Sequence, residues 1–250
     1  MKCLNFCLSA FCIIISSSLF AQTPKQIEAD LRKSFEKVRY WEEHKFDTTT
    51  NISGYDSIQK ANRIFQAKLK RYTSKYPFTL DQKFTSISDL SIKTSANKQL
   101  RIYSWDDGTG GTLRNYKAVI QFKSSGKIYS LIAHDAAFYN GVYQLNYKGK
   151  TYYLAEYFIQ AMSSYFGQGI EVWAIENNSL NRQVKIFKTA KGIKSQIDYA
   201  YWYDDKLNGD LKYDEKTNTL SIPATAKGEK LTGKRILYKF TGQYFERVKN

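Results

Sequence analysis

The feature that most constrains the fold is a change in the spacing of apolar residues near Phe84. Before this point, apolar side chains recur every three or four residues, which is the spacing of one face of an α-helix. After it, they alternate with polar residues over short segments separated by turns, which is the pattern of half-buried β-strands. The sequence therefore predicts a helical segment followed by a long β-rich region.

Two amphipathic helices are predicted over residues 22–80. Thr23, Pro24 and Gln26 mark the start of the first helix, because threonine caps, proline suits the first helical position and glutamine completes a capping box. Pro77 ends the second helix. Their apolar stripes are Ile27, Leu31, Phe35, Val38 and Trp41, and Ile58, Ala61, Phe65, Leu69, Tyr72 and Tyr76. We expect a helical hairpin that covers a face or edge of the sheet, with a partner-binding helix as the alternative.

Residues 81–250 are predicted to form antiparallel strands joined by short turns. The predicted strands are 87–93, 101–105, 118–122, 128–133, 142–147, 151–155, 170–175, 184–188, 197–203, 211–213, 219–222, 235–240 and 244–248. Residues 156–166 fit a helix or a long strand, and the strand is favoured because the neighbouring segments are hairpins. Regular turns of this kind are typical of an antiparallel meander, barrel, sandwich or propeller-like arrangement. The fold class is therefore predicted as mainly β (α+β), one globular unit with the helices.

The first 21 residues have the features of a signal peptide. Lys2 is followed by an apolar run over 4–15, and Ala21 suits the position before a cleavage site. The cysteines, Cys3, Cys7 and Cys12, all lie in this segment, so the remaining chain has neither a disulfide nor a thiol nucleophile. We expect an exported protein, periplasmic or secreted, with no transmembrane segment after cleavage.

The charge is strongly positive, at +15, and comes mainly from scattered lysines. One interpretation is a solvated surface, and the other is attraction to anionic envelope polymers. Because the basic residues do not form a continuous run, nucleic acid is not an expected partner.

The segment from Trp105 to Thr112 is the strongest candidate for a binding loop. Asp106 and Asp107 offer carboxylates, Thr109 offers a hydroxyl, and the glycines allow close backbone approach. The alternative is a structural turn with Trp105 in the core. The spacing does not match a calcium loop, and no metal is predicted.

Alternating tyrosines form the second candidate. Tyr199, Tyr201 and Tyr203 fall on one face of a strand, and exposed tyrosine is a common interface anchor. The sequence has no dinucleotide or Walker glycine motif, no zinc-protease motif and no serine elbow, so neither a cofactor nor a catalytic residue is predicted.

Three stretches resemble a group of secreted β-rich proteins of Bacteroidota-type bacteria for which no activity is established. They are Phe20-Ala21-Gln22, the string RIYSWDDGTGGT, and the closing TGKRILYKFTGQYFERV. The resemblance implies export and a β-rich fold and assigns no site residue.

The leading functional prediction is a non-enzymatic binding protein that presents an aromatic, basic surface to a glycan or a protein. One alternative is a cell-wall or polysaccharide hydrolase that uses carboxylates near Asp106 and Asp107. The other alternative is electrostatic adhesion to anionic envelope polymers.

Overall fold

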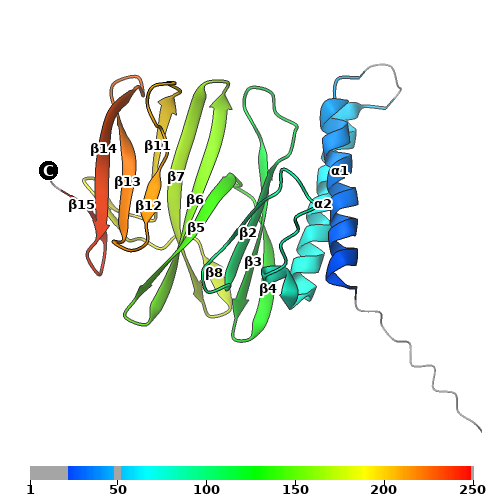
Figure 1. Cartoon of the computed structure of the whole chain (residues 1–250), viewed down its shortest axis with the longest axis horizontal. Coiled ribbons are helices and arrows are strands. Elements are labelled where there is room, and N and C mark those ends of the chain that lie inside the picture. Colours follow the sequence, from blue (N-terminus) through cyan, green and yellow to red (C-terminus); the bar gives the residue numbers. More distant parts are fainter. Residues whose placement is uncertain (1–21, 48–51, 249–250) are drawn as a thin grey trace, which may run out of the picture.

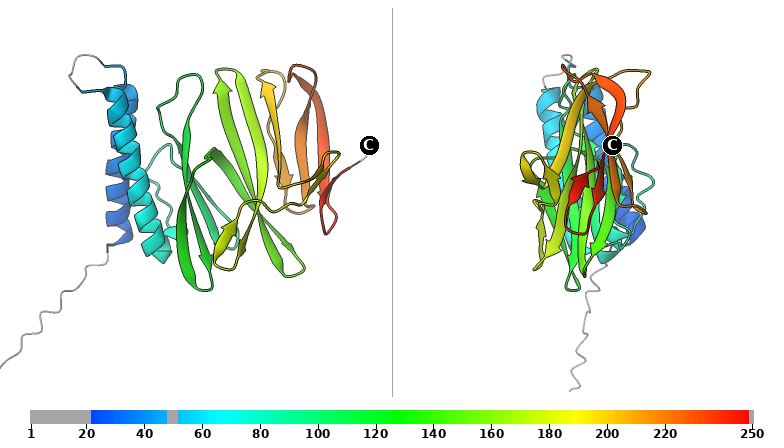
Figure 2. Two further views of the ribbon diagram at one scale, coloured as in Figure 1. Left: turned by 180° about the vertical axis from the view of Figure 1, so that it is seen from behind. Right: turned by 90° about the vertical axis from the view of Figure 1, so that its left-hand side faces the viewer.

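A pair of helices and three β-sheets are stacked as successive layers along the long axis of the molecule (Figure 1). The computed structural model describes residues 22–47 and 52–248, so the predicted signal peptide lies outside the described residues. Figure 2 shows the same stack from behind, with the helices and the third sheet at opposite ends. The predicted mainly β fold with two N-terminal helices is confirmed.

The helical layer consists of α1 (Pro24–Glu43) and α2 (Gly54–Lys75), followed by a short 3-10 helix, Pro77–Leu80. The capping box at Thr23 and Gln26 is present as predicted. Among the described residues, neither helix is long and apolar enough to cross a membrane.

The sheets follow one another in chain order, apart from one returning strand. The first contains β1 (Ser91–Thr94), β2 (Leu100–Asp106), β3 (Tyr116–Ser124) and β4 (Lys127–Ala133). The second contains β5 (Phe138–Tyr147), β6 (Lys150–Met162), β7 (Tyr165–Glu176), the small β8 (Ser179–Asn181) and β11 (Gln196–Trp202). The third contains β9 (Phe187–Thr189), β10 (Gly192–Lys194), β12 (Lys212–Asp214), β13 (Thr219–Thr225), β14 (Leu231–Phe240) and β15 (Phe245–Arg247). The pairings are antiparallel except for that of β15 with β9.

Apolar cores fill the spaces between the layers, so both faces of β2 are buried. Tyr103 and Trp105 point toward the helices and pack with their buried stripes. Leu100 and Ile102 point the other way, toward the second sheet. A third core lies between the second and third sheets. The predicted alternation of β2 is therefore confirmed, although neither of its faces is exposed.

The main differences from the predicted elements lie at residues 87–90 and between residues 176 and 194, and the ambiguous segment 156–166 is resolved. Residues 87–90 form turns, because Phe84 and Asp89 adopt positive φ and interrupt an extended backbone. Residues 156–166 are strand, as favoured, with a turn between β6 and β7. Residues 176–182, between two predicted strands, contain β8, which pairs with β7. A small hairpin of β9 and β10 takes the place of the strand predicted at 184–188.

Candidate functional site

Trp105 lies in the core rather than on a surface. Its side chain is 0% exposed, and its ring meets that of Phe65 edge-on at a centroid distance of 4.9 Å. The indole Nε1 donates to Asn62 Oδ1 at 2.9 Å, and the Asn62 amide donates to the Asp107 carbonyl at 2.8 Å. Trp105 is therefore withdrawn from the predicted ligand-binding set, because a fully buried indole cannot touch a ligand.

Asp107 and Thr109 stabilise the turn that follows β2. The Asp107 Oδ1 atom accepts hydrogen bonds from the Thr109 amide at 2.9 Å and from its hydroxyl at 2.6 Å. The other carboxylate oxygen of Asp107, which is buried, lies 3.5 Å from Lys117 Nζ. The Asp107 carboxylate and the Thr109 hydroxyl, which we predicted as ligand contacts, are thus occupied within the protein. Both residues act as structural parts of the turn.

The glycine-rich turn attaches the helical layer to the first sheet. The Lys45 ammonium donates to the carbonyls of Gly108 and Gly110, each at 2.7 Å. Gly108 has a φ of +70°, and a Cβ atom there would lie 2.8 Å from side-chain atoms of Glu42 and Ile58. The positive φ favours glycine at this position, and the side chains of the helices approach its backbone closely.

The Asp106 carboxylate is held at this turn and also lines an open groove that extends across the second sheet. One carboxylate oxygen lies 3.3 Å from Arg114, and the other accepts a hydrogen bond from the Gly108 amide at 2.9 Å. The groove, which we call the aromatic groove, has a volume of about 550 Å³. Its aromatic lining is Tyr116, Phe138, Phe158, Phe166, Tyr201 and Tyr203, and its polar lining is Asp106, Asn140, Gln168 and Asp210.

Strand register brings these rings together from distant parts of the sequence. Phe138 of β5 is paired with Phe158 of β6, and Phe158 is paired with Gln168 of β7. Phe166 of β7 is in turn paired with Tyr201 of β11. Directly paired residues lie on the same face of a sheet, so the groove crosses four adjacent strands.

Phe166 is the centre of the aromatic cluster. Its ring centroid lies 5.4 Å from that of Phe158, 6.0 Å from that of Tyr201 and 6.3 Å from that of Tyr203. At the other end of the groove, Tyr116 and Phe138 have centroids 5.9 Å apart. The spacing is that of favourable aromatic pairs.

The predicted tyrosine row divides between support and surface. Tyr201 is buried, whereas Tyr203 is 63% exposed. The hydroxyl of Tyr199 lies 2.8 Å from the Gly209 carbonyl and 3.1 Å from Gln168 Oε1. Burial raises the pKa of both Tyr199 and Tyr201, so both remain neutral hydrogen-bonding groups at ordinary pH.

Gln168 holds the loop after β11 against the sheet. Its amide nitrogen donates to the Tyr201 hydroxyl at 2.9 Å, and its amide oxygen accepts from the Leu211 backbone at 3.0 Å. A Cβ atom at Gly209 would lie 2.3 Å from the Tyr201 ring, so the loop contacts that ring directly. This network fixes Tyr201 and the segment that carries Asp210 before any ligand binds.

Glu156 is a buried acid on the strand that carries Phe158. Its carboxylate accepts a hydrogen bond from the Tyr143 hydroxyl at 2.7 Å. Burial raises the pKa of Glu156, and the negative charge of Asp210 adds to that effect, while the Tyr143 hydrogen bond and Lys93 oppose it. The native state therefore binds a proton at Glu156 more readily than the unfolded chain does.

The raised pKa predicts how Glu156→Gln changes stability. As pH rises from the unfolded pKa through the native one, the wild type loses stability because its native state must release a proton it holds tightly. The glutamine variant has no such loss, so its advantage should be absent at acid pH and grow to a plateau at neutral pH. A tenfold difference in proton affinity corresponds to about 1.4 kcal/mol.

The measurement is urea unfolding of both proteins between pH 4 and 8. Glu43→Gln, which changes an exposed residue at the end of α1, provides the control against which the pH profile of Glu156→Gln is compared. A Glu156→Gln advantage that is the same at every pH would show that the effect is one of packing and not of ionisation.

The sequence prediction found Asp106, Tyr201 and Tyr203 of the groove and missed its other members. Two of these, Phe158 and Phe166, lie in the segment whose secondary structure was ambiguous, so their faces were undefined. The clue that was available is the aromatic content on both sides of the turn at 163–164. Cross-strand partners such as Phe138 could be found only with the strand register.

The described residues contain no group of three or more acidic, histidine or cysteine side chains arranged to hold a metal ion. The acidic loop after β11 uses its side chains in turns. Asp204 accepts from the Lys206 amide and Asn208 accepts from the Asp210 amide, at 2.9 and 2.7 Å.

No protein-family model matches this sequence, and no curated protein matches it. The function is therefore inferred from the geometry of the aromatic groove.

Proposed function

We propose that the protein is a binding protein that holds a neutral glycan chain in the aromatic groove. The observation that carries the proposal is the alignment of aromatic rings from four adjacent strands along one open groove, with carboxylate and amide groups between them. Ring faces offer flat apolar surfaces to sugar rings, and the polar groups can accept or donate hydrogen bonds to hydroxyls.

The dimensions of the groove support an extended ligand. Neighbouring strands lie about 4.8 Å apart, so a groove across four strands spans about 14 Å. A volume of about 550 Å³ also falls within the range of ligand pockets. A stable protein partner would need a contact of about 800 Å² on each side. A short stretch of polysaccharide fits these dimensions better than a folded protein does.

The contacts of Asp106 and Asp107, the carboxylates that the hydrolase alternative would use, support binding over hydrolysis. A glycosidase needs two carboxyl groups on either side of the scissile bond, one of them held protonated. Asp106 is engaged by Arg114 and a turn amide, and Asp107 by Lys117 and Thr109. In these contacts both carboxylates hold the turn together, and they do not stand on two sides of a bound chain as a glycosidase requires. We place this binding function outside the cytoplasm on the strength of the N-terminal signal-like segment.

Two neighbouring exposed rings give a direct test. Tyr203 lines the groove and is 63% exposed, whereas Trp202 is 42% exposed and packs on the opposite face against Tyr165 at 4.9 Å. Tyr203→Ala should weaken binding of a neutral polysaccharide at least about tenfold, which is about 1.4 kcal/mol. Trp202→Ala should change it less than about twofold, because the ring does not face the groove.

The measurement is affinity electrophoresis in gels containing soluble mixed-linkage glucan, xylan or mannan. Thermal melting of both variants checks that they fold. The proposal is rejected if none of these polymers retards the wild type. It is also rejected if Tyr203→Ala and Trp202→Ala lose the same amount of retardation relative to the wild type.

A further inference from the structure

A second pocket lies at the opposite end of β11 from the aromatic groove, between the second and third sheets. It has a volume of about 740 Å³ and is lined by residues of β9, β10, β11, β13, β14 and β15. We call it the cationic pocket. Residues 196–198 at the start of β11 line it, whereas Tyr201 near the other end of the strand and Tyr203 just beyond that end line the groove. At about 3.3 Å per residue, Ile197 and Tyr203 are about 20 Å apart.

The charge of this pocket is strongly positive. Lys188, Lys191, Lys194 and Arg247 line it, and Asp198 is the only acid among the described lining residues. Lys188 is already paired with Glu246 at 3.0 Å. Lys191, Lys194 and Arg247 are exposed, and no hydrogen bond or ion pair occupies their cationic groups in the part of the chain that the structure describes.

The floor of the pocket is apolar and carries a phenol. Ile197 and Ile222 contribute aliphatic surface, and Tyr238 contributes a ring. Arg247 and Tyr238 are direct cross-strand partners, so the cation and the ring lie side by side. A ligand whose ring lies on this apolar floor could place an acidic substituent next to the cations at the rim of the pocket.

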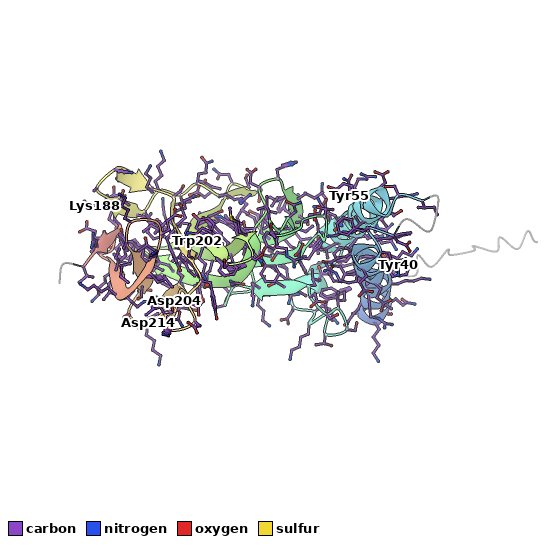
Figure 3. The ribbon with its side chains drawn as sticks, turned by 90° about the horizontal axis from the view of Figure 1, so that it is seen from above. Tyr40, Tyr55, Lys188, Trp202, Asp204 and Asp214 are labelled. Carbon is purple, nitrogen blue, oxygen red and sulfur yellow. The ribbon has the colours of Figure 1, made fainter. Side chains whose placement is uncertain are left out.

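Lys188 of the pocket lies apart from the acidic residues Asp204 and Asp214. Seen from above, Lys188 lies at one edge of the third sheet, and Asp204 and Asp214 lie at the opposite edge (Figure 3). The positive field at the pocket is therefore not cancelled by these neighbouring carboxylates.

From these observations we infer that the cationic pocket binds an acidic sugar, one whose ring carries a carboxylate or phosphate, as a unit of an anionic polysaccharide. The apolar floor takes the sugar ring, and Lys191, Lys194 and Arg247 take the anionic group. Single-stranded nucleic acids are usually bound by a charged track with several stacking rings, whereas this pocket has one ring. The inference is independent of the aromatic groove, which contains no lysine or arginine among its described lining residues.

The test compares two triple variants of equal charge. The first is Lys191→Gln, Lys194→Gln and Arg247→Gln in the pocket. The control is Lys33→Gln, Lys37→Gln and Lys60→Gln, all exposed on the helical layer at the other end of the molecule. Binding of polygalacturonate is measured by calorimetry at low ionic strength, with methyl-esterified polygalacturonate as the uncharged counterpart and galacturonic acid as the single unit.

The pocket variant should bind polygalacturonate at least tenfold more weakly than the wild type, and the control variant less than twofold. The methyl ester should bind the wild type, the pocket variant and the control variant with the same affinity, because it has no charge for the pocket cations to recognise. Galacturonic acid should compete with polygalacturonate. Equal weakening in both variants would show that the net charge and not the pocket is responsible. If an oligodeoxythymidylate of the same charge binds as tightly as polygalacturonate, the pocket is assigned to nucleic acid. If the wild type does not bind polygalacturonate, the inference is rejected.

Because Tyr203→Ala leaves the cationic pocket intact, it should not change polygalacturonate binding. Loss of neutral glycan binding in Tyr203→Ala and loss of polygalacturonate binding in the pocket variant are therefore separate results, and either proposal can fail alone.

Discussion

Replacing Trp105 with alanine is expected to lower the free energy of unfolding by about 3–5 kcal/mol. The ring is fully buried between β2 and the helices, where it contacts Phe65. Its removal leaves a cavity in the helical interface and also leaves Asn62 Oδ1 without its indole donor. Urea unfolding followed by circular dichroism measures the loss.

Two further variants separate packing from hydrogen bonding. Trp105→Phe keeps most of the ring contact but removes the Nε1–H donor, so it should cost about 1–3 kcal/mol. Trp202→Ala removes an exposed indole that packs against Tyr165 and should cost about 1 kcal/mol. If Trp105→Ala unfolds at the wild-type urea concentration yet binds glycan poorly, the assignment of Trp105 to the core is wrong.

The order of the elements could be predicted from the sequence because local periodicity survives in the fold. The stripe of Ile27, Leu31 and Phe35 is buried as its spacing requires, and Tyr103 and Trp105 share one face of β2. For a strand with two apolar faces, periodicity cannot show whether either face is exposed. In β2 neither is, because layers cover both sides.

The role of the Trp105 to Thr112 segment could not be predicted from its residue types alone. Carboxylates and glycines side by side suit a ligand loop and a tight turn equally well. The choice is made by Lys45, Asn62 and Lys117, which come from other elements and use the carbonyls and the Asp107 carboxylate. No local pattern in the sequence connects these residues to the turn.

The aromatic groove was partly predictable for a related reason. Tyr201 and Tyr203 alternate along β11 and the residue that follows it, so a period of two is enough to place them on one face. Phe138, Phe158 and Phe166 join them through pairing between strands, which depends on turn lengths and on the register of each hairpin. The loop residue Asp210 is placed by the backbone of Leu211 on Gln168, a contact between residues far apart in the chain.

The largest expected effect on binding is that of Phe166→Ala. This ring is the one that contacts Phe158, Tyr201 and Tyr203, so its loss divides the aromatic surface into two separate parts. Central aromatic anchors in an interface often contribute at least about 2 kcal/mol, which corresponds to about a thirtyfold loss of affinity. Affinity electrophoresis on the polysaccharide that retards the wild type measures this loss.

Tyr165→Ala is the matched control, because Tyr165 is the preceding residue of β7 and its side chain lies on the opposite face, against Trp202. It should bind the polysaccharide as the wild type does. Phe166→Leu then distinguishes stacking from apolar volume, since leucine fills much of the same space without an aromatic face. We expect Phe166→Leu to lose most of the affinity while it melts close to the wild-type temperature. If it instead binds as the wild type does, the groove recognises apolar surface and not the faces of sugar rings, and the glycan proposal does not stand.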